Sequence, residues 1–189
     1  SRKKNSMDIF HIAAECYPVA KVGGLGDVVG ALPKYQGKLC HNVKVVIPCY
    51  DAKIIAENEF ESIYSDIVQL GSFNFPFSIH KKKTNNLGFE LYLVQISELF
   101  DRKEMYGYED DIERFLSFQI ATLNWINSLS KIPDLIHCHD HHTGLVPFMM
   151  QYANKYEKLR NITSILTIHN AIYQGQFSLD KLYYLPEFV

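Results

Sequence analysis

The chain of 189 residues is long enough for one domain of ordinary size, and its 47% hydrophobic and 21% charged residues are typical of a globular protein. Its formal net charge of −2 argues against a nucleic-acid partner, because domains that bind nucleic acid usually carry a basic excess on one face. No stretch approaches the ~20 apolar residues of a membrane span, and no signal-peptide core opens the chain. We therefore expect a cytoplasmic protein with no membrane partner.

The first 50 residues predict a strand–helix–strand unit. Residues 7–14 form an apolar run typical of a strand buried on both faces. A helix is expected from Gly26 or Asp27 to about residue 39, with Pro33 kinking or restarting it. Residues 43–48 form a second buried strand.

The next segment departs from this alternation. Strand-like runs cover residues 60–70, 72–82 and 89–96, and residues 85–88 supply turn residues between the last two. We expect an inserted antiparallel hairpin at the edge of the domain. The lysines at 81–83 are interpreted as charge that protects its tip.

Helices and strands alternate again after residue 100. The patterns predict helices over 113–129 and 143–155 and strands over 135–138 and 164–168. Such alternation predicts an α/β domain with a Rossmann-like, doubly wound, mostly parallel sheet. We expect a tail over residues 1–6 and one domain over residues 7–189.

The four cysteines form no C-x-x-C pair and lie in or beside apolar runs, so we expect buried free thiols instead of disulfides or zinc. They are Cys16, Cys40, Cys49 and Cys138.

A glycine-rich segment, residues 21–27, joins the first predicted strand to its helix. A helix N-terminus presents unpaired N–H groups and partial positive charge, glycines allow close approach, and Lys21 adds a full charge. The spacing matches neither the dinucleotide fingerprint nor the P-loop. The segment predicts an anion site, and a plain glycine-rich turn is the alternative.

Residues 137–142, His-Cys-His-Asp-His-His, form the densest group of functional side chains. A metal site is one interpretation, but Asp140 comes one position earlier than in the H-x-H-x-D-H pattern of hydrolases. A hydrogen-bonding role at the strand end is expected for His137 and Asp140, while His139 is the sharper functional candidate. We expect no metal.

Two further polar clusters suit a sugar. Asp110 or Asp111 caps the following helix, accepts bonds from sugar hydroxyls, or does both, with tyrosines nearby for the apolar faces of the rings. Residues 169–175 place imidazole, amide and aromatic groups at a strand end, which suits a neutral polyhydroxyl ligand, although Asn170 could instead satisfy loop backbone groups. Ligands of open α/β sheets bind at the carboxyl ends of the strands, so one shared site is expected.

In their order, these motifs resemble the N-terminal part of bacterial glycogen synthases and plant starch synthases. The resemblance begins near Met7 and runs to the end of the chain. Gly26 stands where that family commonly has alanine, and His141 where it usually has tryptophan. The similar segments are Lys21 to Pro33, Phe100-Asp101-Arg102 with Tyr106-Gly107, Asp110 to Phe115, His137 to Pro147 and Thr167 to Phe177.

The resemblance implies the N-terminal half of a GT-B fold. It also implies a retaining glucosyltransferase that moves glucose from a nucleotide sugar, ADP-glucose in preference to UDP-glucose, to the nonreducing end of an α-1,4-glucan. No cofactor is implied. The implied residues are Lys21, Gly23 and Gly24 at the donor, catalytic His139 at the transferred glucose, and Asp27, Asp110, Asn170 and Tyr173 at the acceptor or donor sugar.

The family's nucleotide-binding domain has no match in these 189 residues. We therefore expect the chain alone to be inactive and to need that C-terminal domain as its partner. Two alternatives of a different kind are a stand-alone glucan-binding module and a metal-dependent hydrolase centred on residues 137–142.

Overall fold

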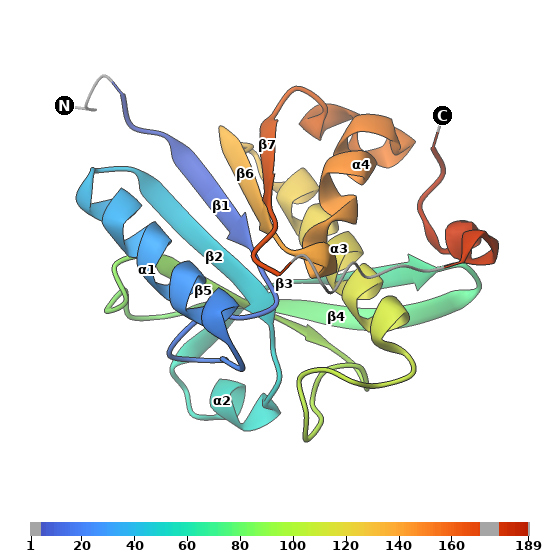
Figure 1. Ribbon diagram of the computed structural model, residues 1–189, viewed down its shortest axis with the longest axis horizontal. Coiled ribbons are helices and arrows are strands. Elements are labelled where there is room, and N and C mark those ends of the chain that lie inside the picture. Colours follow the sequence, from blue (N-terminus) through green and yellow to red (C-terminus); the bar gives the residue numbers. More distant parts are fainter. Residues whose placement is uncertain (1–4, 171–177, 189) are drawn as a thin grey trace.

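The computed structural model describes residues 5–170 and 178–188, and within them seven strands form a single sheet (Figure 1). The order across the sheet is β3-β4-β5-β2-β1-β6-β7. The strands are β1 (Asp8–Ile12), β2 (Asn42–Pro48), β3 (Phe60–Leu70), β4 (Phe73–Lys82), β5 (Glu90–Ile96), β6 (Leu135–His139) and β7 (Thr163–Thr167).

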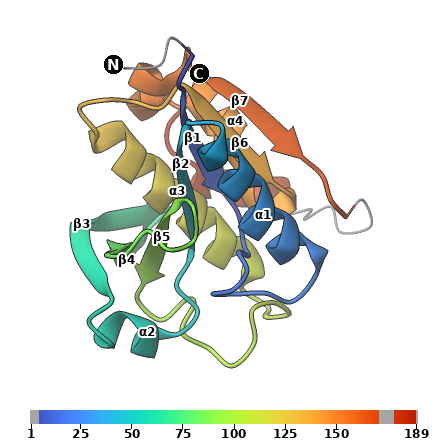
Figure 2. The same ribbon diagram turned by 90° about the vertical axis from the view of Figure 1, so that its left-hand side faces the viewer.

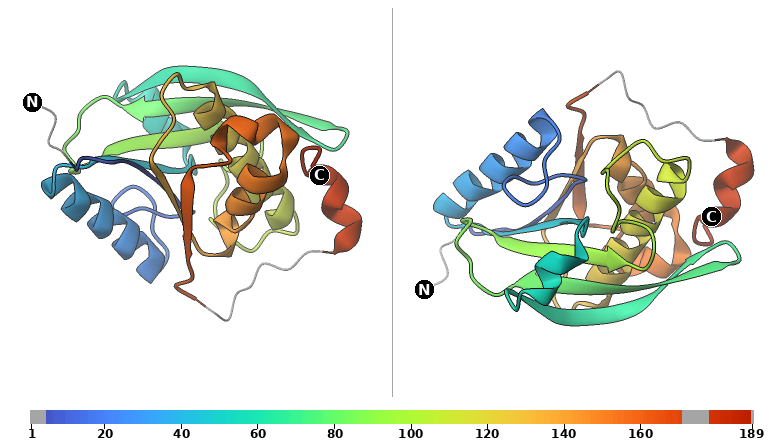
Figure 3. Two further views of the ribbon diagram at one scale, coloured as in Figure 1. Left: turned by 90° about the horizontal axis from the view of Figure 1, so that it is seen from above. Right: turned by 90° about the horizontal axis from the view of Figure 1, so that it is seen from below.

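Helices cover both faces of this sheet. Figure 2 shows α1 on one face and α3 on the other, and the two views of Figure 3 show the same separation. The α-helices are α1 (Gly24–Lys38), α2 (Ala52–Ala56), α3 (Asp111–Ser128) and α4 (Leu145–Tyr152), and the short 3-10 helices are η1 (His141–Thr143), η2 (Asn154–Leu159) and η3 (Leu179–Tyr184). The layered arrangement confirms the predicted α/β class.

The sheet is parallel in one part and antiparallel in the other. β5, β2, β1, β6 and β7 are parallel to one another, whereas β3 and β4 add antiparallel strands at one edge. This confirms the mostly parallel sheet with an antiparallel insertion. The interpretation of the lysines was wrong in part, because Lys81 lies in a strand that is paired on both sides and contacts Glu90 at 3.2 Å.

Helix α1 begins at Gly24, two residues earlier than predicted, and runs through Pro33 without restarting. Proline lacks an N–H, so the carbonyl one turn earlier, that of Val29, loses its helical donor. The thiol of Cys16 lies within reach of that carbonyl, with Sγ 3.7 Å from the Val29 oxygen and 3.5 Å from the Tyr17 oxygen. The loop after β1 therefore offers a donor to the carbonyl that the proline leaves unpaired, and of the two expected outcomes, a kink or a restart, the restart was wrong.

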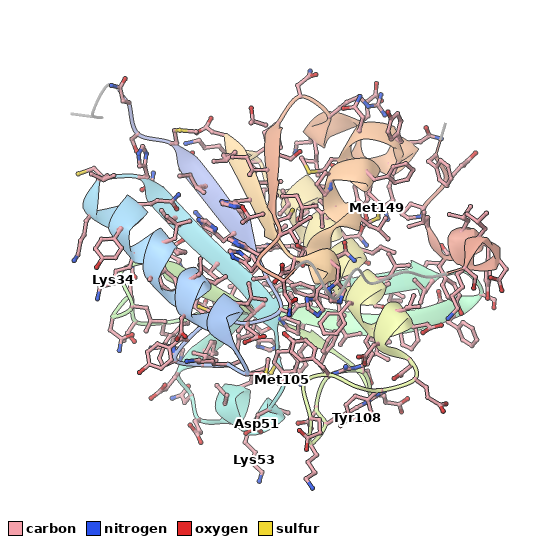
Figure 4. The ribbon with its side chains drawn as sticks, in the orientation of Figure 1. Lys34, Asp51, Lys53, Met105, Tyr108 and Met149 are labelled. Atoms are coloured by element: carbon pink, nitrogen blue, oxygen red, sulfur yellow. The ribbon has the colours of Figure 1, made fainter. Side chains whose placement is uncertain are left out.

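Other boundaries also differ from the prediction. The helix expected over 143–155 is divided into η1, α4 and η2, because Ala153 has extended backbone angles that end α4. Helix α2, which no sequence pattern predicted, has five residues and is capped by the Asp51 carboxylate, which accepts from the Lys53 N–H at 2.9 Å. Figure 4 labels both residues at this short helix.

None of the four cysteines forms a disulfide. Three of them, Cys16, Cys49 and Cys138, are buried, and burial raises the pKa of Cys16 and Cys138 to about 12. Cys40 is exposed, so the expectation of four buried thiols was wrong at that position. Among the described residues, no helix has the length and apolar character needed to cross a bilayer.

Candidate functional site

Polar loops gather at the carboxyl ends of the parallel strands. The segment that follows β1 and the segment that precedes α3 both lie at the lower side of the view in Figure 1. The chain leaves β6 at Asp140 and β7 at Ile168 on the same edge of the sheet, because these strands are parallel and adjacent. The described residues of the four clusters predicted from the sequence therefore share one edge.

Glu15 organises the glycine-rich loop. Its carboxylate, in a residue only 4% exposed, accepts the N–H groups of Val22 at 2.8 Å and Gly23 at 3.0 Å, and the hydroxyl of Tyr106 at 2.6 Å. The Gly23 N–H expected to meet the donor is thus bonded to a side chain of the protein. The N–H of Gly24, in the first turn of α1, has no intrahelical partner by the geometry of a helix start.

Lys21 and Asp27 form an ion pair at the start of α1, with Nζ 2.8 Å from Oδ1. Their side chains are 40% and 56% exposed, and a pair of this exposure contributes about 0–1 kcal/mol. Asp27 lies in the first turn of α1, as predicted, where its negative charge interacts favourably with the helix dipole. A stronger anion can therefore displace Asp27 from Lys21 at low cost.

Four histidines lie together at the sheet and its carboxyl edge. His11 of β1 is in register with His137 of β6, and His139 shares the face of His137. His11 Nδ1 is 2.9 Å from His139 Nε2, and His139 Nδ1 is 3.0 Å from His169 Nε2. The other nitrogen of His11, Nε2, lies 2.7 Å from Oε1 of Gln36 on α1.

His139 is completely buried, and both of its ring nitrogens are bonded to other histidines. Burial, helped by the neighbouring histidines, lowers the pKa of His139 to about 2, and burial lowers that of His11 to about 4. Both rings are therefore neutral near neutral pH. His169, which is exposed, is the member of the row that reaches the surface.

Ring nitrogens of His11, His137 and His139 lie within 4.8 Å of one another, close enough to suggest a metal site. The 2.9 Å between His11 and His139 is shorter than the about 3.3 Å expected between two nitrogens on a tetrahedral zinc. His137 Nε2 is also engaged, at 2.7 Å from Thr167 Oγ1. This geometry fits rings that share protons better than rings arranged around an ion.

Asp140 holds the strand end that carries His169. Its Oδ1 accepts the N–H groups of His169 at 2.6 Å and Asn170 at 3.2 Å. Its backbone has φ 60° and ψ −177°, a conformation that costs a non-glycine residue about 1–3 kcal/mol. The expected hydrogen-bonding role of Asp140 is confirmed, and the strain indicates that its exact placement matters.

The loop before α3 is held by two arginines. Arg102 donates to both carboxylate oxygens of Asp110 at 2.7 and 2.8 Å, so Asp110, the residue predicted to bind a sugar, is paired with an arginine of the protein. Asp111 accepts the N–H groups of Gly107 and Tyr108 and pairs with the buried Arg114 at 2.8 Å. Asp110 is the N-cap residue of α3 and Asp111 lies in its first turn, as the capping interpretation predicted, although the side chain of Asp110 makes no capping hydrogen bond.

Tyr106 connects three of the loops. Besides donating to Glu15, its ring stacks on His142 with centroids 4.9 Å apart, and His142 in turn packs on Phe115. His141 stands where the family that the sequence resembles usually has tryptophan, and its ring centroid lies 3.8 Å from that of His142. The positions of the glycine loop, the loop before α3 and η1 are therefore mutually fixed. Figure 4 labels Met105 and Tyr108, which belong to the loop before α3.

Sequence reasoning missed Glu15, His11 and Gln36 as parts of this site. Tyr173, assigned to the sugar, lies outside the described residues. Two surface hollows of about 270 and 400 Å³ lie elsewhere, the first near Gly37 and the second beside η3.

A mostly parallel sheet with helices on both faces and polar loops at its carboxyl edge is the architecture of an α/β domain, the class in which ligands bind at that edge. Residues 8–188 match the family model described as the starch synthase catalytic domain. The chain belongs to this family, as predicted.

Similar curated proteins support the same family assignment. The glycogen synthase of Flavobacterium johnsoniae is 63% identical over 182 residues, which are 96% of this chain and 38% of that protein. A glycogen synthase of Streptococcus pneumoniae is 39% identical over 178 residues, 93% of this chain and 37% of that protein. The chain thus spans less than two fifths of the curated relatives it matches.

A solved structure gives the same result for the fold. The catalytic domain of starch synthase IV from Arabidopsis thaliana, bound to ADP and acarbose, superposes with a TM-score of 0.83 and 30% identity over 94% of this chain and 37% of that one. The expected GT-B type of fold is confirmed by this likeness.

Proposed function

We propose that the chain is the N-terminal domain of a glycogen or starch synthase, a retaining glucosyltransferase that acts in the cytoplasm. Its donor would be a nucleotide sugar, with ADP-glucose favoured over UDP-glucose, and its acceptor an α-1,4-glucan. The match of residues 8–188 to the family carries this proposal. The likeness to a starch synthase bound to ADP and acarbose supports both ligand classes.

The share of each relative that the chain covers supports the need for a partner domain. The chain covers 37–38% of those proteins, and the remainder of each is long enough to contain a second domain that binds the nucleotide. On this proposal the chain supplies one side of the cleft, and transfer requires both domains.

Lys21 is the proposed contact of the donor diphosphate. Its exposed ion pair with Asp27 is weak enough to exchange, and the first turn of α1 adds partial positive charge beside it. A cation at this place stabilises the charge that develops on the departing diphosphate. Once exchanged, Asp27 has a carboxylate available for a sugar hydroxyl.

The histidine row and Asp140 are the proposed support of the transferred glucose. Asp140 fixes the backbone of His169 and Asn170 after the end of β7, and the buried His139 shares a hydrogen bond with the ring of His169. His139 then contributes through His169, since its own nitrogens are both engaged. Asp110 would shape the neighbouring loop through Arg102.

The test is Lys21→Ala in the protein that carries both domains. We expect kcat/KM for ADP-glucose to fall at least about tenfold, because a charge that stabilises the leaving group is lost. Lys34→Ala is the matched control, since Lys34 is an exposed lysine within α1, away from the loop before this helix that carries Lys21 (Figure 4). Equal kcat/KM for the two variants would refute the donor assignment.

A further inference from the structure

An unbroken series of hydrogen bonds runs from helix α1 to the carboxyl edge of the sheet. It begins at Gln36 Oε1, continues through His11 and His139, and ends at His169. The three contacts measure 2.7, 2.9 and 3.0 Å. The first three members are half-buried or buried and the last is exposed.

The chemistry at the inner end sets a direction for the whole series. An amide oxygen only accepts, so Nε2 of His11 carries the proton of the first contact. In a neutral imidazole the other nitrogen is then an acceptor, so Nδ1 of His11 receives a proton from Nε2 of His139. By the same rule, Nδ1 of His139 receives one from Nε2 of His169.

The series therefore fixes one tautomer at each ring. In the neutral ring of His169, whose one proton is directed to His139, the remaining nitrogen, Nδ1, holds a lone pair and no proton. Burial supports the single proton on His139, because a completely buried ring strongly disfavours the doubly protonated form that would break the pattern.

We propose that Gln36 is a positioning residue that acts through His11 and His139 to hold His169 as a hydrogen-bond acceptor at the carboxyl edge. A ligand hydroxyl would donate to Nδ1 of His169, whereas a ligand carbonyl or phosphate oxygen would find no proton there. This last step rests on the proposed function, since it takes a sugar hydroxyl as the ligand. The tautomers themselves do not depend on it.

The test observes the ring nitrogens directly. Two-bond ¹H–¹⁵N correlation spectra of the chain labelled with ¹⁵N-histidine, at neutral pH, distinguish Nε2–H from Nδ1–H rings among its eight histidines. Single histidine-to-glutamine variants assign the signals. We expect His11, His139 and His169 to be Nε2–H.

Gln36→Leu removes the acceptor at the inner end. A buried Nε2–H without a partner is costly, so the series should reverse, and the ratio of Nε2–H to Nδ1–H at His169 should fall at least about fivefold. Gln36→Met, which preserves the length of the side chain, is the second variant. Gln95→Leu is the matched control, because Gln95 Oε1 contacts His80 at 3.0 Å away from the series and should alter His80 alone.

An Nδ1–H ring at His169 in the unmodified chain would overturn the proposal. So would Gln36 variants that fold, change His11 and leave His169 as it was. A failed Lys21→Ala test would refute the donor-diphosphate assignment and leave these tautomer results intact, so the two ideas fail separately.

Discussion

Glu15 is predicted to be the main determinant of the conformation of the glycine-rich loop. It makes three hydrogen bonds, two through Oε1 to the N–H groups of Val22 and Gly23 and one through Oε2 to the hydroxyl of Tyr106. Hydrogen bonds to a charged group contribute about 1.5–3 kcal/mol each. Because the loop is partly exposed, water can replace the carboxylate at the two N–H groups, and we expect Glu15→Ala to lower the free energy of unfolding by about 2–4 kcal/mol.

Glu15→Gln separates geometry from charge. The glutamine keeps one oxygen for both loop N–H groups, and its amide can donate to the Tyr106 oxygen, so we expect a smaller loss of about 1–2 kcal/mol. Urea unfolding followed by fluorescence measures both values, because the chain has a single tryptophan, Trp125, which is buried against Phe10.

A double-mutant cycle of Glu15→Ala with Tyr106→Phe isolates the 2.6 Å bond between them. We expect a coupling energy of about 1–2 kcal/mol. Equal losses for the alanine and glutamine variants, or a coupling below about 0.5 kcal/mol, would refute the idea that this carboxylate shapes the loop.

Three other changes have defined outcomes. In Gly30→Ala the new Cβ would lie 2.7 Å from the backbone oxygen of Tyr17, so we expect the free energy of unfolding to fall by about 1–3 kcal/mol. In Gly24→Ala the new Cβ meets open space, so we expect no loss of stability. Equal urea midpoints for the two variants would contradict this expectation. Burial lowers the pKa of His142 to about 3, so its contribution to stability is complete above its unfolded pKa near 6.5 and is lost as the pH falls toward 3. His142→Phe should therefore reduce the loss of stability between pH 7 and pH 5 by about 2 kcal/mol, and an unchanged pH profile would count against it. Arg114→Met leaves a partly buried carboxylate without its cation and should cost about 3–5 kcal/mol in denaturant unfolding, with a loss below 1 kcal/mol as the contrary result.

Much of the fold could be predicted because periodicity is a local property. The strands over 60–70, 43–48 and 135–138 were placed to within one residue at each end, since each is a continuous apolar or alternating run. Pro33 misled the prediction because the donor within reach of the unpaired Val29 carbonyl is the thiol of Cys16, a residue outside the helix. A five-residue helix such as α2 is too short for any periodicity to show.

The site was predictable only as far as each motif is continuous in sequence. Residues 137–142 were recognised, but His11 stands 128 positions before His139 and was hidden within a strand pattern. Its importance arises from the pairing of β1 with β6, which sequence spacing does not reveal. Glu15 was likewise unmarked, because one acidic residue in a loop carries no pattern.

The place of β1 in the sheet has a consequence for how the protein folds. This strand is the first in the chain, yet it lies between β2 and β6, so its second partner is synthesised more than 120 residues later. Loop closure over such a distance makes the pairing slow and late compared with local hairpins such as β3 and β4. Until β6 arrives, β1 presents an unpaired apolar edge, which is the point at which a nascent or truncated chain is most prone to aggregate.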